Sequence, residues 1–140
     1  MVKRAVVTLF LVGVVGLIGM QFVPYGRDHT NPPVVSEPVW DSSATRATAV
    51  KACFDCHSNQ TVWPWYSRVA PVSWLVWSDV VRGRKELNFS EWDRPQREAR
   101  ESGSAIRKGS MPPWYYPWAQ LTATERQTLV QGLDATVGRK

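Results

Sequence analysis

The longest apolar stretch of the chain lies at its beginning. After Lys3 and Arg4, residues 5–23 form a run of 19 in which only Thr8 and Gln21 are polar. A helix needs about 20 apolar residues to span a bilayer, whereas a signal peptide has a shorter apolar core and a small-residue cleavage site. No such site follows the run. Residues 1–23 are therefore predicted to form a single uncleaved membrane anchor, with a cleaved signal sequence as the alternative.

The two basic residues before the run predict its orientation. Lys and Arg are enriched on the cytoplasmic side of membrane spans, so Lys3 and Arg4 place the N-terminus in the cytoplasm. The rest of the chain then lies on the far side. This predicts a single-pass protein of a cytoplasmic membrane, with its C-terminal domain on the side opposite the cytoplasm.

Proline and small polar residues dominate the stretch after the anchor, residues 24–42. Proline has no backbone donor and biases the residue before it toward extended geometry. We expect an extended linker here. The remaining residues, 43–140, are then predicted to form one folded domain.

Apolar residues in that domain recur at helical spacing. The first predicted helix covers residues 44–52, with Ser42 or Ser43 as its cap. The second has Pro71 in its first turn, and its apolar positions approximate one face: Val72, Leu75, Val76, Val80 and Leu87.

Two more helices are predicted nearer the C-terminus. Ser90 opens one that ends near Gly109, and the capping-box pattern of Thr122 and Glu125 opens the last. No segment alternates with period two as a strand would. The predicted fold class is therefore all-α, a small helical domain preceded by one transmembrane helix.

Charge past the anchor is balanced and dispersed. Of the 17 basic residues Lys3 and Arg4 precede the apolar run, which leaves 15 against 12 acidic ones. No Lys/Arg block is present, so nucleic-acid binding is not indicated. A small basic cluster on the second predicted helix forms either a solvated face or a docking patch for an acidic redox partner: Arg82, Arg84 and Lys85.

The two cysteines and a histidine form the motif that carries chemistry, Cys53-Phe-Asp-Cys56-His57. Two thiols one helical turn apart can each bond a vinyl-derived carbon on one edge of a porphyrin, and the adjacent imidazole can ligate the iron. The motif predicts one covalently attached haem c. All eight tryptophans lie after the anchor, and a flat apolar cofactor would give them something to pack against.

Two other readings use the same residues. A thioredoxin-like redox pair belongs beside a βαβ pattern, which this sequence lacks. A zinc site needs four ligands, usually in two separated pairs, and only His29 could supplement the motif. Both readings are disfavoured.

The second axial ligand of the iron must come from elsewhere. Met111, followed by two prolines, is predicted to present its sulfur from a loop opposite His57. The alternative is that Met111 only fills space among neighbouring aromatic rings. His29 in the linker is the less favoured candidate for the iron ligand.

At these residues the sequence resembles two families. The order of a Cys-x-x-Cys-His helix, a Met-Pro loop and a final helix is similar to class I cytochromes c. Over nearly all of the part after the anchor, the chain is more closely similar to the bacterial haem-binding domain family, which are small membrane-anchored proteins with one c-type haem. The matching segments are residues 27–33, 53–59, 61–66, 70–74, 87–92, 109–112 and 121–126.

The resemblance implies a haem-c domain with Met111 or a nearby group opposite His57. In that family a His-Pro pair often follows the Met-Pro loop, but Tyr116-Pro117 stands here. That difference removes one conceivable alternative ligand.

Aromatic residues soon after the motif are candidates for the haem pocket. The residues that would wall the porphyrin are Trp63, Trp65, Tyr66 and Trp74, and the indole N–H groups of the three tryptophans would donate to the haem propionates. Arg68 would neutralise those carboxylates. Ordinary core packing is the alternative for each tryptophan.

These expectations lead to electron transfer as the predicted function. A membrane-tethered periplasmic monohaem cytochrome would exchange electrons with membrane oxidoreductases or other redox proteins, with no small-molecule substrate and no enzymatic activity. The tether would raise its concentration at such partners. The alternatives are a haem-based sensor or small-ligand binder, and an accessory haem subunit of a larger membrane complex.

Overall fold

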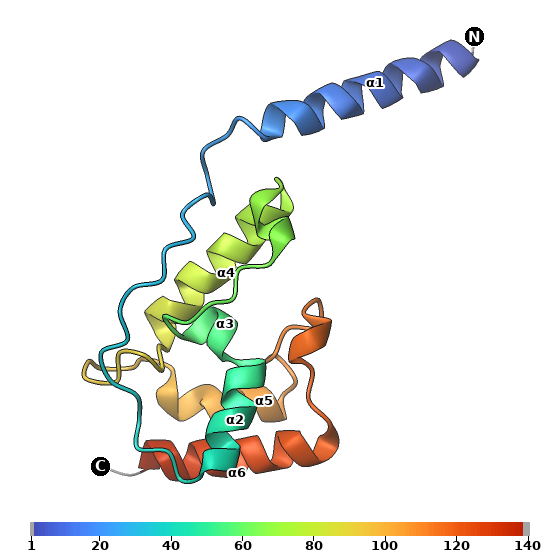
Figure 1. The fold of residues 1–140 in the computed structure, drawn as a ribbon. Helices are drawn as coiled ribbons and strands as arrows, with labels where there is room; N and C mark the ends of the chain where they lie inside the picture. The colour runs from blue at the N-terminus through green and yellow to red at the C-terminus, as the bar shows by residue number, and fades with distance from the viewer. Residues whose placement is uncertain (1, 139–140) are drawn as a thin grey trace. The chain divides into compact units, whose positions relative to one another are not determined.

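Helices provide the regular secondary structure of this protein (Figure 1). The structure is a computed structural model that describes residues 2–138. Within those residues no strand forms, and a single isolated bridge joins Ser36 to Glu91. The all-α prediction is confirmed. The α-helices are α1 (Val2–Met20), α2 (Ser43–Ala52), α3 (Phe54–His57), α4 (Val72–Glu86), α5 (Ser102–Arg107) and α6 (Ala123–Gly138), with 3-10 turns η1 (Trp65–Arg68), η2 (Ala99–Glu101) and η3 (Pro117–Ala119).

The chain forms two units. The first unit contains the chain up to His29 together with Trp63–Asp79. The second unit contains Thr30–Val62 and the chain from Val80 onward. The predicted boundaries of anchor, linker and domain stay a prediction from the sequence.

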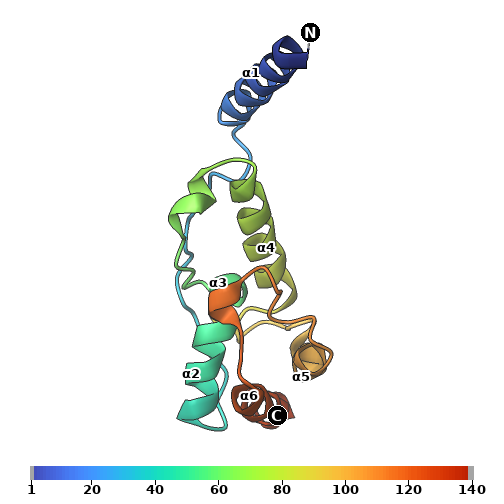
Figure 2. The ribbon, with the colours of Figure 1, turned by 90° about the vertical axis from the view of Figure 1, so that its right-hand side faces the viewer.

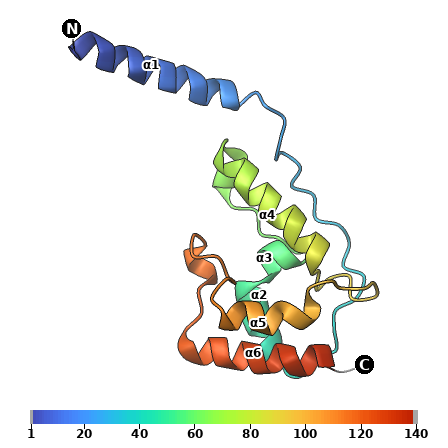
Figure 3. The ribbon, with the colours of Figure 1, turned by 180° about the vertical axis from the view of Figure 1, so that it is seen from behind.

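The core of the second unit lies where α6 meets α2 and α5. Both helices contact α6, and Figure 2 shows them on either side of it, while Figure 3 shows α5 running beside it. The contact with α2 is close, because a Cβ atom at Gly132 would lie 2.0 Å from Thr45 Oγ1. The buried apolar residues that pack together in this core are Ala49, Phe54, Leu87, Phe89, Ala99, Ile106, Leu129, Val130 and Leu133.

Local sequence signals define where two helices begin, as predicted. The Ser42 hydroxyl accepts a hydrogen bond from Thr45 N at 3.1 Å, which caps α2. At α6, Glu125 N donates to Thr122 Oγ1 at 3.2 Å, and Thr122 N donates to Glu125 Oε2 at 2.8 Å. This reciprocal pair is the capping box that the sequence predicts.

The helix predicted to start at Ser90 is wrong over its first half. Residues 88–98 form turns, and the helical part is confined to η2 and α5. Side chains replace the helical hydrogen bonds: Asn88 N donates to Gln96 Oε1, and Ser90 N donates to Asn88 Oδ1. Asn, Ser and Gln side chains compete with the helix for backbone groups in this way.

Residues 24–42, predicted as an extended linker, contain no helix, and hydrogen bonds and ring contacts hold parts of them. In the first unit, Tyr25 packs edge-on against Trp77 with ring centroids 4.9 Å apart. In the second unit, Asn31 Nδ2 donates to Thr61 O, and Val35 N donates to Ser90 O. Residues 31–36 therefore form hydrogen bonds within the second unit.

Helix α1 is apolar and has no buried residue. Among the described residues it is the helix long and apolar enough to cross a membrane, by length and composition. Gln21, directly after it, bonds to Ala70 within the first unit.

Candidate haem site

The two cysteines stand at a junction between helices of the second unit. Cys53 follows α2, and its N–H donates to Ala49 O at 2.8 Å, while Cys56 lies in α3. His57 N donates back to Cys53 O at 2.8 Å, which closes one turn. Neither cysteine is in a disulfide. Burial raises the pKa of the Cys53 thiol to about 12, so the sulfur is protonated at neutral pH.

The imidazole of His57 is held by two backbone carbonyls of α4 and the residue after it. Its Nδ1 lies 3.1 Å from Gly83 O and 3.0 Å from Leu87 O. A carbonyl oxygen only accepts, so Nδ1 carries the hydrogen and Nε2 carries the free lone pair. Burial also lowers the pKa of His57, against the raising effect of those two carbonyls. The result is a neutral imidazole in the tautomer that ligates a metal through Nε2.

The close approach of α4 to the motif depends on Gly83. A Cβ atom at this position would lie 2.3 Å from Cys56 O and 2.9 Å from Cys56 C. Backbone atoms cannot move aside as the end of a side chain can. The absent side chain therefore allows the Gly83 carbonyl to reach His57.

Arg84 fixes the backbone that follows His57. Its guanidinium donates to Ser58 O at 2.8 Å and to Thr61 Oγ1 at 2.9 Å. It also reaches Thr30 O at 3.1 Å and Asn31 Oδ1 at 2.7 Å. Arg84 thus bonds within the fold, whereas the sequence pattern grouped it with Arg82 and Lys85 as surface charge.

Buried amides and hydroxyls continue this network behind His57. The backbone carbonyl of His57 accepts from Phe89 N at 2.8 Å. Asn59 N donates to Ser90 Oγ at 2.9 Å, and Asn88 Nδ2 donates to Asn59 Oδ1 at 2.8 Å. The position of the imidazole is therefore set by several elements at once.

Met111 lies in the same unit as His57, in the loop after α5. Its N–H donates to Ala105 O at 3.3 Å, and the residue is 40% exposed. Further along this loop, η3 contacts α2, the helix that leads into the cysteines. The loop is anchored on both sides of Met111, and its role as iron ligand stays a prediction.

A model of the haem-binding domain family matches residues 15–135. The chain belongs to the haem-binding domain family. The match includes both cysteines, His57 and Met111, and it supports haem as the cofactor. No curated protein and no solved structure gives a significant match. The likeness to class I cytochromes c remains a prediction from two motifs.

The donors of this haem-binding domain fit a haem better than a bare metal ion. Among residues 2–138, no group of three or more His, Cys, Asp or Glu side chains is placed to hold an ion. A porphyrin supplies its own four nitrogens, so the protein needs to add only axial ligands. The free Nε2 of His57 meets that need, and the unbridged thiols of Cys53 and Cys56 suit attachment to the ring edge.

The aromatic residues predicted as haem pocket all belong to the first unit of the haem-binding domain. Trp63 stacks on His29, with ring centroids 4.3 Å apart. The buried Nε1 atoms of Trp63 and Trp74 and the Nε2 of His29 have no hydrogen-bond partner. Trp65 and Arg68 are exposed, Tyr66 is half-buried, and the contact of any of them with haem stays a prediction.

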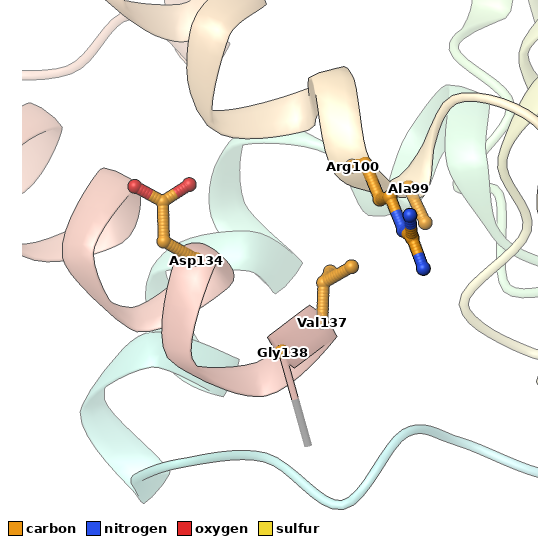
Figure 4. Close-up of a pocket in the computed structure, with 5 residues that line it drawn as sticks. All are labelled: Ala99, Arg100, Asp134, Val137 and Gly138. Atoms are coloured by element: carbon orange, nitrogen blue, oxygen red, sulfur yellow. The ribbon is translucent and has the colours of Figure 1, made fainter. Parts of the chain in front are cut away.

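A pocket of about 290 Å³ lies elsewhere in the second unit, between η2 and the end of α6 (Figure 4). Its lining contains none of the residues of the motif: Ala99, Arg100, Asp134, Val137 and Gly138.

Sequence reasoning missed Gly83, Arg84, Asn59 and Asn88, which lie around the motif. Asn59 and Asn88 are buried polar residues. In the sequence Asn88 stands between Leu87 and Phe89, whereas Asn59 stands between the polar residues Ser58 and Gln60, and neither pattern marks a site. The carbonyls of Gly83 and Leu87 leave no signal at all, because every residue type has a carbonyl.

Proposed function

We propose that this protein is a membrane-tethered periplasmic cytochrome with one covalently bound haem c, and that it transfers electrons. The observation that carries the proposal is the pair of hydrogen bonds that orients the imidazole ring of His57. Its Nδ1–H is taken up by Gly83 O and Leu87 O, so Nε2 is oriented and unprotonated before any metal binds. The membership in the haem-binding domain family and the apolar helix α1 support the same proposal.

Cys53 and Cys56 would attach the cofactor through thioethers. Each S–H adds across one vinyl group: a sulfur–carbon bond forms, the hydrogen goes to the other vinyl carbon, and no electron is gained or lost. Cys53 and Cys56 would thus hold the ring edge, with His57 next to Cys56 in the chain. The haem then supplies a one-electron ferric/ferrous couple.

Met111 is proposed as the second axial ligand. A thioether sulfur favours ferrous iron and raises the potential, which suits a carrier that passes electrons to a membrane oxidoreductase. The hydrogen bonds from Ser110 N and Met111 N to Ala105 O hold the start of the loop. With both axial positions taken, no substrate would reach the iron, so no enzymatic activity is expected.

A second candidate function is small-ligand binding. Met111 is 40% exposed and lies in a loop, and a methionine in such a position can be displaced from iron by a gas. A sensor would use that displacement.

The absorption spectrum of the purified full-length protein tests the proposal. Sulfur ligation gives ferric haem a weak band at the red edge of the spectrum. We expect the band in the wild type, its loss in Met111→Ala, and its retention in Met20→Ala, a methionine of similar exposure in α1. Prompt binding of carbon monoxide by the wild-type ferrous protein would favour the ligand-binding function instead.

A further inference from the structure

The end of the anchor helix is joined to a distant loop by a reciprocal pair of hydrogen bonds. Gln21 Nε2 donates to Ala70 O at 2.9 Å, and Ala70 N donates to Gln21 Oε1 at 3.0 Å. Gln21 directly follows α1, which ends at Met20. A backbone position 49 residues later is therefore held within one side chain of the point where the span ends.

A second contact holds the start of α4 to the same stretch of chain. Gly26 has φ +71, and a Cβ atom there would lie 3.1 Å from Ser73 O and 3.2 Å from Trp74 Cα. Tyr25 packs its ring edge-on against Trp74 and Trp77. Residues 65–75 are thus fixed to the exit of α1 at two places.

The segment held at this exit exposes apolar side chains. Trp65 is 78% exposed, the highest value among the large apolar side chains of this segment. Residues 63–78 contain no acidic residue and one basic residue, Arg68. The remaining exposed apolar side chains of the segment and of the exit itself are Val69, Val72, Leu75, Phe22, Val23 and Tyr25.

These features match the chemistry of a membrane interface. Trp and Tyr concentrate at the level of the lipid headgroups, where an apolar ring and a polar N–H or O–H are both satisfied. An arginine in such a segment can direct its charge to lipid phosphates while its methylene groups stay in apolar contact. In bulk water the exposed Trp65 ring would have no apolar surroundings to contact.

We propose that residues 65–75 dock on the lipid headgroup layer through which α1 leaves the membrane. The lipid surface is the occupant because Gln21 and Gly26 fix this segment to the end of the span. The proposal rests on the proposed membrane anchoring of α1. It gives the protein a second membrane contact besides its anchor helix.

Hydroxyl-radical oxidation of the full-length haem protein in lipid nanodiscs tests this, with one protein copy per disc. The lipid is phosphatidylcholine with phosphatidylglycerol, and mass spectrometry reads the oxidation rate of each side chain. Trp114 is the matched control, because it is 86% exposed and lies in the second unit. We expect Trp65 to be oxidised at least about fivefold more slowly than Trp114, since lipid covers it. Equal rates would overturn the proposal.

The oxidation rate of Phe10 in α1 distinguishes a failure of the docking proposal from a failure of the membrane anchoring. Phe10 is 69% exposed within the protein, so only lipid would protect it. If Phe10 is protected and Trp65 reacts as fast as Trp114, the anchor stands and the docking is wrong. If Phe10 reacts freely, both are wrong. A lipid with a photoreactive group near its headgroup identifies the occupant: adducts within residues 65–75 are expected. Protection of Trp65 without such adducts would also overturn the proposal, because protein and not lipid would then cover it.

Discussion

The Nδ1 atom of His57 lies 3.0 Å from the backbone carbonyl oxygen of Leu87, 30 residues further along the chain. This carbonyl directly follows α4, where the negative end of the helix dipole lies. The N–H of the imidazole therefore donates into a region of negative potential. Such a bond makes Nε2 a stronger donor to a metal, and it fixes the plane of the ring.

Replacement of Gly83 by alanine should disturb this arrangement. The new Cβ would lie 2.3 Å from Cys56 O, so α4 must move away from α3. We expect the haem protein to lose about 1–3 kcal/mol of stability and to shift its reduction potential as His57 loses the Gly83 carbonyl. Denaturant titration and a redox titration measure the two effects. Gly138→Ala is the control, because a Cβ there meets nothing within 4 Å; equal behaviour of the two variants would contradict the role of Gly83.

Removal of both thiols should abolish covalent attachment. The double variant Cys53→Ala, Cys56→Ala should lose its haem on denaturing electrophoresis, because a haem held by axial ligands alone dissociates when the chain unfolds. Each single variant should keep one thioether and therefore its haem stain. The intact mass of the wild type should exceed that of the chain by one haem. Haem retained by the denatured double variant would show that another residue attaches it.

Arg84 should contribute more to stability than its neighbour Arg82. Arg84→Ala removes four hydrogen bonds, of which those to Ser58 O and Thr61 Oγ1 are part-buried, and the expected loss is about 2–3 kcal/mol. Arg84→Lys should recover only part of this, because an ammonium cannot reproduce the fork of a guanidinium. Arg82 is exposed, so Arg82→Ala should change stability by less than about 0.5 kcal/mol. Equal losses from Arg84→Ala and Arg82→Ala would show that the network is dispensable.

Acid should weaken the contact between Glu37 and α2. Arg46 binds Glu37 through two hydrogen bonds of 2.7 Å, and these lower the pKa of the Glu37 carboxyl. The folded pKa then lies below the unfolded one, so this stabilisation is present above the unfolded value and is lost as pH falls through the folded value. Glu37→Gln should cost about 0.5–1 kcal/mol at neutral pH.

The difference in unfolding free energy between Glu37→Gln and wild type, followed by urea titration, should disappear in acid. Asp134→Asn is the comparison, because the ion pair of Asp134 with Arg107 is about half exposed on both sides and should contribute less. A difference for Glu37→Gln that stays constant down to strong acid would contradict the assignment.

Gln21→Ala should loosen the loop that contains Ala70. The variant removes both hydrogen bonds between the exit of α1 and that residue. Amide hydrogen exchange in reconstituted protein should become faster at Ala70, by about tenfold for a loss near 1.4 kcal/mol. Thr8→Ala is the control, because Thr8 bonds only within α1, to Arg4 O. Unchanged exchange at Ala70 in the Gln21 variant would show that these bonds do not hold the loop.

Local signals allowed the sequence to predict the parts of the fold that depend on neighbours in the chain. Ser42 caps α2, and Thr122 with Glu125 begins α6, because caps involve residues three apart. The first half of the helix expected from Ser90 was wrong, since the side chain of Asn88 bonds to the backbone there instead. Periodicity cannot anticipate that competition.

In the candidate site, too, the sequence could predict the part that depends on neighbouring residues but not the part that depends on distant ones. Cys53, Cys56 and His57 form a short motif and could be read directly. The carbonyls that orient His57 and the four bonds of Arg84 join residues 23 to 54 positions apart. Such contacts depend on a close approach that only the absent side chain of Gly83 permits, and a single sequence does not reveal it.

The wide separation of His57 from its two carbonyls also sets an order in time. A ribosome adds roughly 5–20 residues each second, so Leu87 follows His57 by several seconds at the slower rate. The helix that buries α2, with Leu129 and Leu133, follows later still. While the chain is still growing, the two thiols and the imidazole already exist without the groups that will enclose them. Synthesis from the N-terminus thus completes the motif before it adds the chain segments that orient His57 and bury α2.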